Sequence, residues 1–213
     1  MTLMRPSTVQ KQTNLLQAAT ALLIEQGYTN TTLDQIVLQC GGSKQTLYRY
    51  FGNKEGMFKA VLAYHLESLE ALFDFSAASQ TSLRAGLLAF GEQYVQRLCS
   101  NPLLGLFRIV VGDFHHHPDI PAFFLSHGPV AKHQQLADYL RQTYPKADVF
   151  SDAEQAAQDL LSLLRERYFY QALLGCPVPD TAHLRQHVHR VVDQFLQGYD
   201  LAPISHESGV TSC

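Results

Sequence analysis

The sequence has no apolar run near the roughly 18 residues that a membrane-spanning helix needs. Residues 1–12 lack the basic start and the apolar block of a secretory signal peptide. With 46% hydrophobic and 16% charged residues, the 213-residue chain has instead the composition of a protein that buries a core. We therefore expect a soluble cytoplasmic protein with no membrane partner.

The four cysteines form no local pair. Cys40, Cys99, Cys176 and Cys213 are far apart in the sequence and include no C-x-x-C motif. Neighbouring residues therefore cannot build a zinc ribbon or a dithiol redox site, and we expect free thiols. Cys40 could couple to an oxidant, although a buried cysteine of this kind is usually inert.

Catalytic motifs are absent as well. The chain contains no G-x-S-x-G, no phosphate-binding glycine loop and no H-E-x-x-H, so we expect neither an enzyme nor a cofactor. The run of histidines at 115–117 suggests a metal, and His183 with His187 could bind zinc from one helix face. However, consecutive loop histidines point in different directions, and no cysteine or carboxylate cluster stands at ligand spacing. We expect no metal site, and expect His183, His187 and His189 on a helix surface or at a subunit contact.

Charge is distributed unevenly along the chain. The formal net charge is −3, which by itself argues against a nucleic-acid partner. Residues 1–60 nevertheless hold six basic and three acidic residues, whereas the remaining 153 residues hold ten basic and sixteen acidic ones. This asymmetry predicts a basic, anion-binding N-terminal part on an acidic body.

Signals for helix ends recur along the chain, whereas strand signals are nearly absent. Capping boxes begin helices at Ser7 and Thr32, Ser43 and Asn53 cap the next two, and glycines end the first three. Gly128-Pro129 should interrupt a later helix. Residues 114–121 should form a loop. The predicted helices cover residues 7–27, 32–40, 43–51, 53–75, 81–99, 103–111, 121–144, 152–175 and 181–198.

The second and third predicted helices, joined by a tight glycine turn, have the pattern of a helix-turn-helix. A helix that reads DNA must be short and exposed, so that its first turn enters the major groove while its partner crosses the backbone. Leu47 and Phe51 are spaced to pack inward. The polar side chains of the third helix therefore face outward, where DNA can reach them.

The residue types on this outward face suit base and phosphate contacts. Gln45 can read a base edge through two hydrogen bonds, Thr46 can contact a thymine methyl, and Lys44 can donate to guanine or to a phosphate. Phosphate contacts are favoured where free amides and a positive helix end lie beside a lysine. The predicted DNA-binding residues are Thr32, Gly42, Ser43, Lys44, Gln45, Thr46, Tyr48, Arg49 and Lys54.

The run TTLDQIVLQCGGSKQTLYRYFGNKEGMF, at residues 31–58, follows a helix that ends in EQGY, and it closely resembles the DNA-binding domain of the TetR family of bacterial repressors. The remainder is similar, more weakly, to the AefR-like subclass of the C-terminal domain in that family. The motifs that carry the second resemblance are FFLSHGP at 123–129, LADYL at 136–140, DAEQAA at 152–157 and LLG at 173–175.

The resemblance implies roles for individual residues. Residues 42–46 should face bases. Two positions depart from the family pattern, because Val37 replaces a common alanine and Gly42 replaces a valine or isoleucine that usually pins the turn. We therefore expect a looser turn and less rigid recognition. The implied phosphate contacts are Thr32, Tyr48 and Lys54.

For the C-terminal part, the resemblance implies a cavity for a hydrophobic or aromatic effector of unknown identity. We also expect a dimer contact between the last two long helices and their two-fold mates, because one recognition helix alone covers too few bases. Arg108 and His127 are candidate polar anchors of the effector. The other candidate cavity residues are Tyr94, Phe107, Phe123, Phe124, Tyr168 and Phe169. The candidate dimer contacts are Leu160, Leu164, Val188, Val192 and Phe195.

These observations predict an all-α, homodimeric regulator of TetR type. Residues 1–60 should form a three-helix DNA-binding domain, residues 61–200 a larger helical ligand-binding and dimerisation domain, and residues 201–213 a flexible tail. The expected function is repression of a double-stranded operator that is released by a small molecule. The alternatives are the same fold responding to a metal, an oxidant or a protein partner, and an α-helical adaptor with no DNA role.

Overall fold

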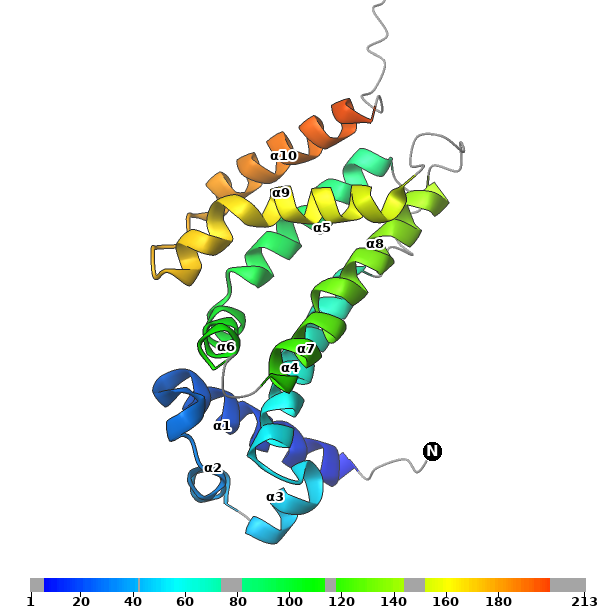
Figure 1. The fold of residues 1–213 in the computed structure, drawn as a ribbon. Coiled ribbons are helices and arrows are strands. Elements are labelled where there is room, and N and C mark those ends of the chain that lie inside the picture. Colours follow the sequence, from blue (N-terminus) through cyan, green and yellow to red (C-terminus); the bar gives the residue numbers. More distant parts are fainter. Residues whose placement is uncertain (1–5, 42, 74–81, 114–117, 144–151, 200–213) are drawn as a thin grey trace, which may run out of the picture.

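The computed structural model describes residues 6–41, 43–73, 82–113, 118–143 and 152–199, in which all regular structure is helical (Figure 1). This confirms the expected all-α fold. Within these ranges no helix is both long and apolar enough to cross a bilayer. The elements are α1 (Pro6–Asn30), α2 (Leu33–Cys40), α3 (Lys44–Phe51), α4 (Lys54–Glu70), η1 (Ala71–Phe73), α5 (Leu83–Leu98), α6 (Asn101–Gly112), α7 (Asp119–His127), α8 (Pro129–Thr143), α9 (Ala153–Leu173) and α10 (Thr181–Gly198).

Several predicted helix ends are confirmed. The interruption at residues 128–129 divides α7 from α8, because α7 ends at His127 and α8 begins at Pro129. Helix α1 has a non-helical backbone at Gly27, with φ of 80° and ψ of 170°, before a last short segment. Asn53 caps α4, since its Oδ1 accepts a hydrogen bond of 2.8 Å from the backbone N–H of Gly56. Gly42, the tail at 201–213 and the histidines at 115–117 lie outside the described residues.

Two hydrophobic cores organise the molecule, and two helices belong to both. The first core holds α1, α2, α3 and the start of α4 together, and we call this part the head; the second fills the remainder, the body. Helix α4 supplies Phe58 and Leu62 to the head core and Leu66 to the body core. Helix α6 supplies Ile109 to the head core and Leu104 to the body core. The head core therefore extends well beyond residue 60.

Helix α6 reaches the head because it carries a glycine where it meets α1. A Cβ atom at Gly105 would lie only 2.8 Å from Cγ1 of Ile24, closer than side chains pack. Since glycine has no side chain, the backbone of α6 lies directly against α1. A displacement of α6 therefore acts on the head without an intervening loop.

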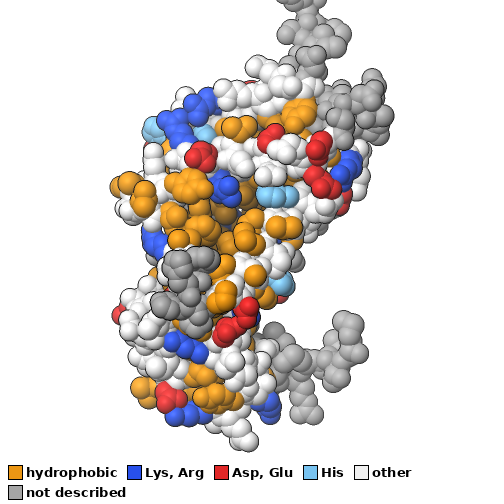
Figure 2. Space-filling view, in the orientation of Figure 1, with side chains coloured by type: hydrophobic (Ala, Val, Ile, Leu, Met, Phe, Trp, Pro, Cys, Tyr) orange, Lys and Arg blue, Asp and Glu red, His pale blue; other side chains and the backbone are white. Residues whose placement is uncertain are grey.

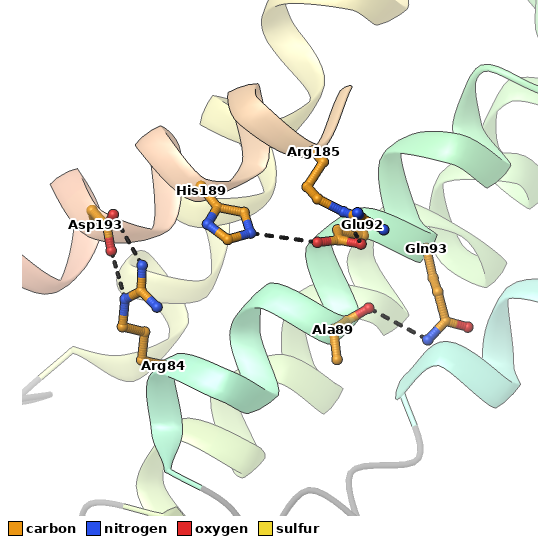
Figure 3. Close-up of polar contacts among 7 residues, drawn as sticks. All are labelled: Arg84, Ala89, Glu92, Gln93, Arg185, His189 and Asp193. Carbon is orange, nitrogen blue, oxygen red and sulfur yellow. Dashed lines mark hydrogen bonds and ion pairs between the residues drawn. The ribbon is translucent and has the colours of Figure 1, made fainter. Parts of the chain in front are cut away.

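Ion pairs join α5 and α10 along one side of the body (Figure 3). Arg84 contacts Asp193 through two nitrogen–oxygen pairs, at 2.8 and 3.1 Å. Glu92 lies 3.2 Å from Arg185 and 3.5 Å from His189. These side chains are partly exposed, so each pair contributes at most about 1 kcal/mol. The pairs orient α10 on α5, while the apolar core supplies most of the stability.

His65 and His133 are partly buried, whereas His187, which the sequence placed on a helix surface or at a subunit contact, is buried within the chain with only 4% of its surface exposed. Burial is the main cause that lowers the pKa of His65, His133 and His187 below 6.5. The pKa of His187 is lowered further by Arg190 and Arg167, although its hydrogen bond to the carbonyl of Leu164 acts in the opposite direction. These histidines are therefore neutral in the folded chain at pH 7.

We expect the free energy of unfolding to fall as the pH is lowered from 7 to 5. The unfolded chain binds protons at these histidines near pH 6.5, whereas the folded chain does not until the pH is lower. Asp180 and Asp193, whose pKa values lie below 3.8, add to the loss only in more acidic solution. Urea denaturation at several pH values measures the effect. The His187→Gln variant should show a smaller slope, and an unchanged slope would contradict the assignment for this histidine.

Candidate DNA-reading surface and ligand cavity

Local hydrogen bonds begin both helices of the helix-turn-helix, α2 and α3. Thr32 Oγ1 accepts from the backbone N–H of Gln35 at 3.3 Å, while Gln35 Oε1 accepts from the N–H of Thr32 at 2.7 Å, so the predicted capping box is confirmed. Gly41 follows with φ of 70°, a conformation that favours glycine. Ser43 Oγ accepts from the N–H of Thr46 at 3.2 Å and begins α3.

Helices α2 and α3 are held by the head core. Each has only eight residues, too few for a stable isolated helix. Leu33 and Ile36 from α2 and Leu47 from α3 are buried, and Phe51 packs against the same core. The inward direction predicted for Leu47 and Phe51 is therefore confirmed, and the opposite face of α3 is left to solvent.

The polar face of α3 is accessible. Thr46 is half-buried, with its hydroxyl 3.0 Å from that of Ser43. Lys and Arg side chains gather at this end of the molecule, with an acidic side chain among them (Figure 2). This arrangement leaves the first turn of α3 free to meet an anionic surface. The predicted DNA-binding residues that are exposed are Thr32, Ser43, Lys44, Gln45, Tyr48 and Arg49.

Both lysines that were predicted to contact DNA already have partners within the chain. Lys44 Nζ lies 2.6 Å from Asp34 Oδ2, and this hydrogen bond is the main cause that raises its pKa. Lys54 Nζ donates to the carbonyl of Thr29 at 3.0 Å and lies 4.5 Å from the ring centre of Tyr28, so burial lowers its pKa. Lys44 must share or exchange its partner to bind DNA, whereas Lys54 also ties α1 to α4.

A cavity of about 70 Å³ lies in the body, walled by helices α4 to α9. Four of the predicted residues line it: Tyr94, Phe107, Phe124 and Phe169. Aliphatic side chains complete most of the remaining wall, as expected for a small-molecule site. The further lining residues are Leu66, Leu69, Leu98, Leu103, Gly128, Pro129, Lys132, His133, Leu161 and Arg165.

Four other predicted residues do not line this cavity. Arg108 is exposed and donates to the carbonyl oxygens of Leu173 and Ala172, at 2.7 and 2.8 Å, so it satisfies the C-terminal end of α9. His127 is also exposed, and its ring stacks on Phe123 with ring centres 4.0 Å apart. Tyr168 packs against His187 instead. The two predicted polar anchors, Arg108 and His127, are therefore replaced as candidates by cavity residues.

Sequence reasoning missed the polar residues that do line the cavity, namely Lys132, His133 and Arg165. Leu161, Arg165 and Phe169 recur at intervals of four residues along α9, so they share one helix face. An arginine in the middle of an apolar face is the signal that could have identified this position. Burial raises the pKa of Tyr94 to about 12, so its phenol remains protonated.

Comparison with known proteins places this geometry in a family. The model of the AefR-like transcriptional repressor C-terminal domain matches residues 85–201, more than half of the chain. The model of bacterial regulatory proteins of the tetR family matches residues 15–61. The chain belongs to the TetR family. It is a DNA-binding transcriptional regulator and not an enzyme.

Individual relatives agree with this assignment. The uncharacterized HTH-type transcriptional regulator YvkB of Bacillus subtilis (strain 168) is 26% identical over 183 residues, which cover 80% of this chain and 85% of YvkB. A putative TetR-family regulator from Mesorhizobium loti MAFF303099 has the same fold, with a TM-score of 0.81 at 22% identity, over 91% of this chain and 98% of that one. The flavonoid-responsive regulator FrrA has a TM-score of 0.72 at 29% identity, over 89% and 97% of the two chains.

The histidines and cysteines considered as metal or redox candidates have the following surroundings in the described part of the chain. No group of three potential metal ligands occurs in the described part of the chain. His183 lies 2.9 Å from Asp180, and His187 bonds to a backbone carbonyl. Cys40, Cys99 and Cys176 are free thiols as expected, while Cys213 falls outside the described residues. Burial raises the pKa of Cys40, which makes its thiol less reactive.

The five predicted dimer contacts are buried within the single TetR-family chain. Leu160, Leu164, Val188, Val192 and Phe195 all belong to the body core, where α9 and α10 pack on each other and on α5. Side chains already covered by their own chain offer almost no surface to a partner. A dimer contact on these helices must therefore use their outward faces.

Proposed function

We propose that this regulator is a homodimeric repressor that leaves its operator when a small hydrophobic or aromatic molecule occupies the body cavity. The observation that carries the proposal is that α4 and α6 both line this cavity and both enter the head core. On α4, Leu66 lines the cavity and Phe58 lies in the head core. On α6, Phe107 lines the cavity and Leu106 lies in the head core. Movement of either cavity wall therefore displaces the head.

The size of the cavity supports a switch of this kind. A volume of about 70 Å³ corresponds to roughly two water molecules, whereas an apolar cavity that accepts benzene measures about 150 Å³. A ligand with an aromatic ring must therefore widen the cavity. Because protein interiors are close-packed, widening moves the helices that form the wall. Such a ligand binds the displaced arrangement more tightly than the present one, which is the condition for shifting the equilibrium.

The chemistry of the cavity wall supports an aromatic effector. Four aromatic side chains reach it, and Phe107 forms edge contacts with both Phe124 and Phe169, with ring centres 5.5 and 5.1 Å apart. Edge-to-face packing is the arrangement that a further aromatic ring can extend. The name of FrrA says that it responds to flavonoids, which are aromatic, and this chain is 29% identical to it.

The dimer that we propose uses the exposed side of α9. Leu163, Tyr170 and Leu174 recur at intervals of seven and four residues, so they form one stripe along the helix. Their exposed fractions are 46%, 43% and 84%, which is high for apolar side chains in a single chain. A two-fold contact through this stripe would cover all three and bring two heads to one operator.

A gel shift with the DNA that flanks the gene of this protein tests the proposal. We expect a specific complex with Kd between about 10⁻⁸ and 10⁻¹¹ M, and release of the DNA by a hydrophobic ligand. Absence of any specific complex would contradict the DNA role. Release by a chelator or an oxidant, and by no organic ligand, would contradict the effector.

Variants of α3 separate base reading from phosphate binding. Gln45→Ala should relax specificity at one base pair, with a loss of about 1–3 kcal/mol for the specific site only. Arg49→Ala should weaken all sequences alike and lower the salt slope by about one per protomer. Arg49 is the better phosphate probe, since Lys54→Ala would also remove the contacts of Lys54 with Thr29 and Tyr28. Equal effects of both variants on specific and random DNA would contradict these roles.

A further inference from the structure

One residue of the cavity wall, Arg165, carries a charge that is unpaired among the described residues. The Nε atom of Arg165 is buried and makes no hydrogen bond. In the described part of the chain, the whole guanidinium forms no hydrogen bond or ion pair. Arginine remains charged in proteins, so burial cannot be relieved by loss of a proton. A partly buried charge without a partner is unfavourable, and it calls for a partner that the protein itself does not supply.

The surroundings of Arg165 make the cavity electropositive. None of the described lining residues is acidic. Lys132 is only 4% exposed; its ammonium lies over the ring of Phe73 and donates to Gln135. His133 is neutral because burial, and then the charge of Arg165, lower its pKa. Arg165 therefore places a fixed positive charge beside an apolar cavity.

We propose that the ligand of this cavity is a monoanion, an apolar and preferably aromatic body with one carboxylate that pairs with the guanidinium of Arg165. This proposal rests on the proposed effector site, and it adds the charge of the effector and the residue that anchors it. The planar guanidinium can offer Nε–H and one terminal N–H to the two oxygens of a carboxylate. The apolar body would then lie along the wall toward Phe107 and Phe169.

The position of Arg165 on α9 places apolar side chains on both sides of a bound carboxylate. Arg165 is one turn from Leu161 and one turn from Phe169, and all three line the cavity. A carboxylate held at the middle of this face places the attached body against apolar side chains in both directions along α9. A neutral ligand of the same shape would leave Nε unsatisfied, and a cationic one would meet the like charge of Arg165. The structure thus favours anions over isosteric alcohols and amines.

Three ligands with one body test the proposal: 4-phenylbutyrate, 4-phenylbutanol and 4-phenylbutylamine, each titrated by calorimetry into the full-length chain without DNA, up to millimolar concentration. We expect the carboxylate to bind about 10- to 100-fold more tightly than the alcohol, and the amine to bind weakest. Octanoate, added as a fourth ligand, separates an aromatic from a straight-chain acid. Failure of the carboxylate to bind, or equal binding of carboxylate and alcohol, would overturn the proposal.

Variants of Arg165 complete the test. Arg165→Gln should remove the preference for the carboxylate and leave alcohol binding within about threefold, while Arg165→Lys should retain part of the preference. Arg97→Gln, at an exposed arginine of α5, is the matched control and should change nothing. Without ligand, Arg165→Gln should melt at the same or a higher temperature, because it removes an unpaired charge. A fall of more than about 4 °C would show that Arg165 is structural and would overturn the proposal.

The same ligands in a gel shift separate this inference from the proposed function. Release of operator DNA by the alcohol or the amine, and not by the carboxylate, would support the cavity as the effector site and contradict its proposed preference for an anion. Arg165-dependent binding of the carboxylate with no effect on DNA would support the anion site and contradict its role as the effector site.

Discussion

Replacing Leu163 by aspartate is expected to convert the proposed dimer into monomers and to reduce operator affinity by at least about 100-fold. Leu163 is 46% exposed on the outward face of α9, in line with Tyr170 and Leu174. A two-fold contact would place two new carboxylates close together in an apolar interface, where desolvation and repulsion both oppose association. A monomer has one reading helix and loses the second half-site.

Size-exclusion chromatography and gel shift measure this effect. Gln158→Asp is the matched control, because Gln158 is exposed on another side of the same helix, and it should leave the dimer intact. A Leu163→Asp variant that remains a dimer with normal operator affinity would place the interface elsewhere. Val192→Asp is not a usable test, since Val192 is fully buried and a charge there would unfold the chain.

The second large effect concerns the coupling between the cavity and the head. We expect a ligand that widens the cavity to lower operator affinity by about 5- to 150-fold, which corresponds to about 1–3 kcal/mol of coupling free energy. Operator DNA must then weaken ligand binding by the same factor, because the linkage is reciprocal. The physical route is the pair of shared helices, with Phe107 of α6 at the cavity and Ile109 in the head core.

Calorimetric titration of the ligand with and without operator DNA measures this reciprocity. Calorimetry is preferred because the sequence has no tryptophan to serve as an optical probe. Arg49→Ala provides the control: at a salt concentration where the wild-type chain binds operator DNA and the weakened variant does not, addition of DNA should leave the ligand affinity of the variant unchanged. Equal ligand affinity of the wild-type chain with and without DNA would mean that the bound molecule is not the effector.

Local features of the head were predictable because they depend on residues close in sequence. The capping box at Thr32 and Gln35, the cap at Ser43 and the inward position of Leu47 all follow from spacings of three or four residues. Such spacings have the same geometric meaning in any helical protein. The predicted helix at residues 53–75 crosses the predicted domain boundary at residue 60, and α4 does contribute to both cores.

The cavity was only half predictable. Tyr94, Phe107 and Phe169 were identified through the resemblance, but Arg108 was chosen as an anchor and lies outside, while Arg165 was missed. An arginine in a helix can cap a neighbouring helix or enter a cavity with the same sequence environment. Which of these it does depends on the helix that packs beside it, and that helix is distant in sequence.

The sequence by itself determined the all-α class, most helix limits, the helix-turn-helix and the basic character of the head, because capping, periodicity and charge are properties of short segments. Only the tertiary structure decided that Leu160 and Val192 are covered by their own chain, that α6 lies against α1 through Gly105, and that Arg165 faces an apolar cavity. Periodicity shows that a helix has an apolar face. It does not show which helix covers that face, since the choice depends on the shapes of side chains from segments far apart along the chain.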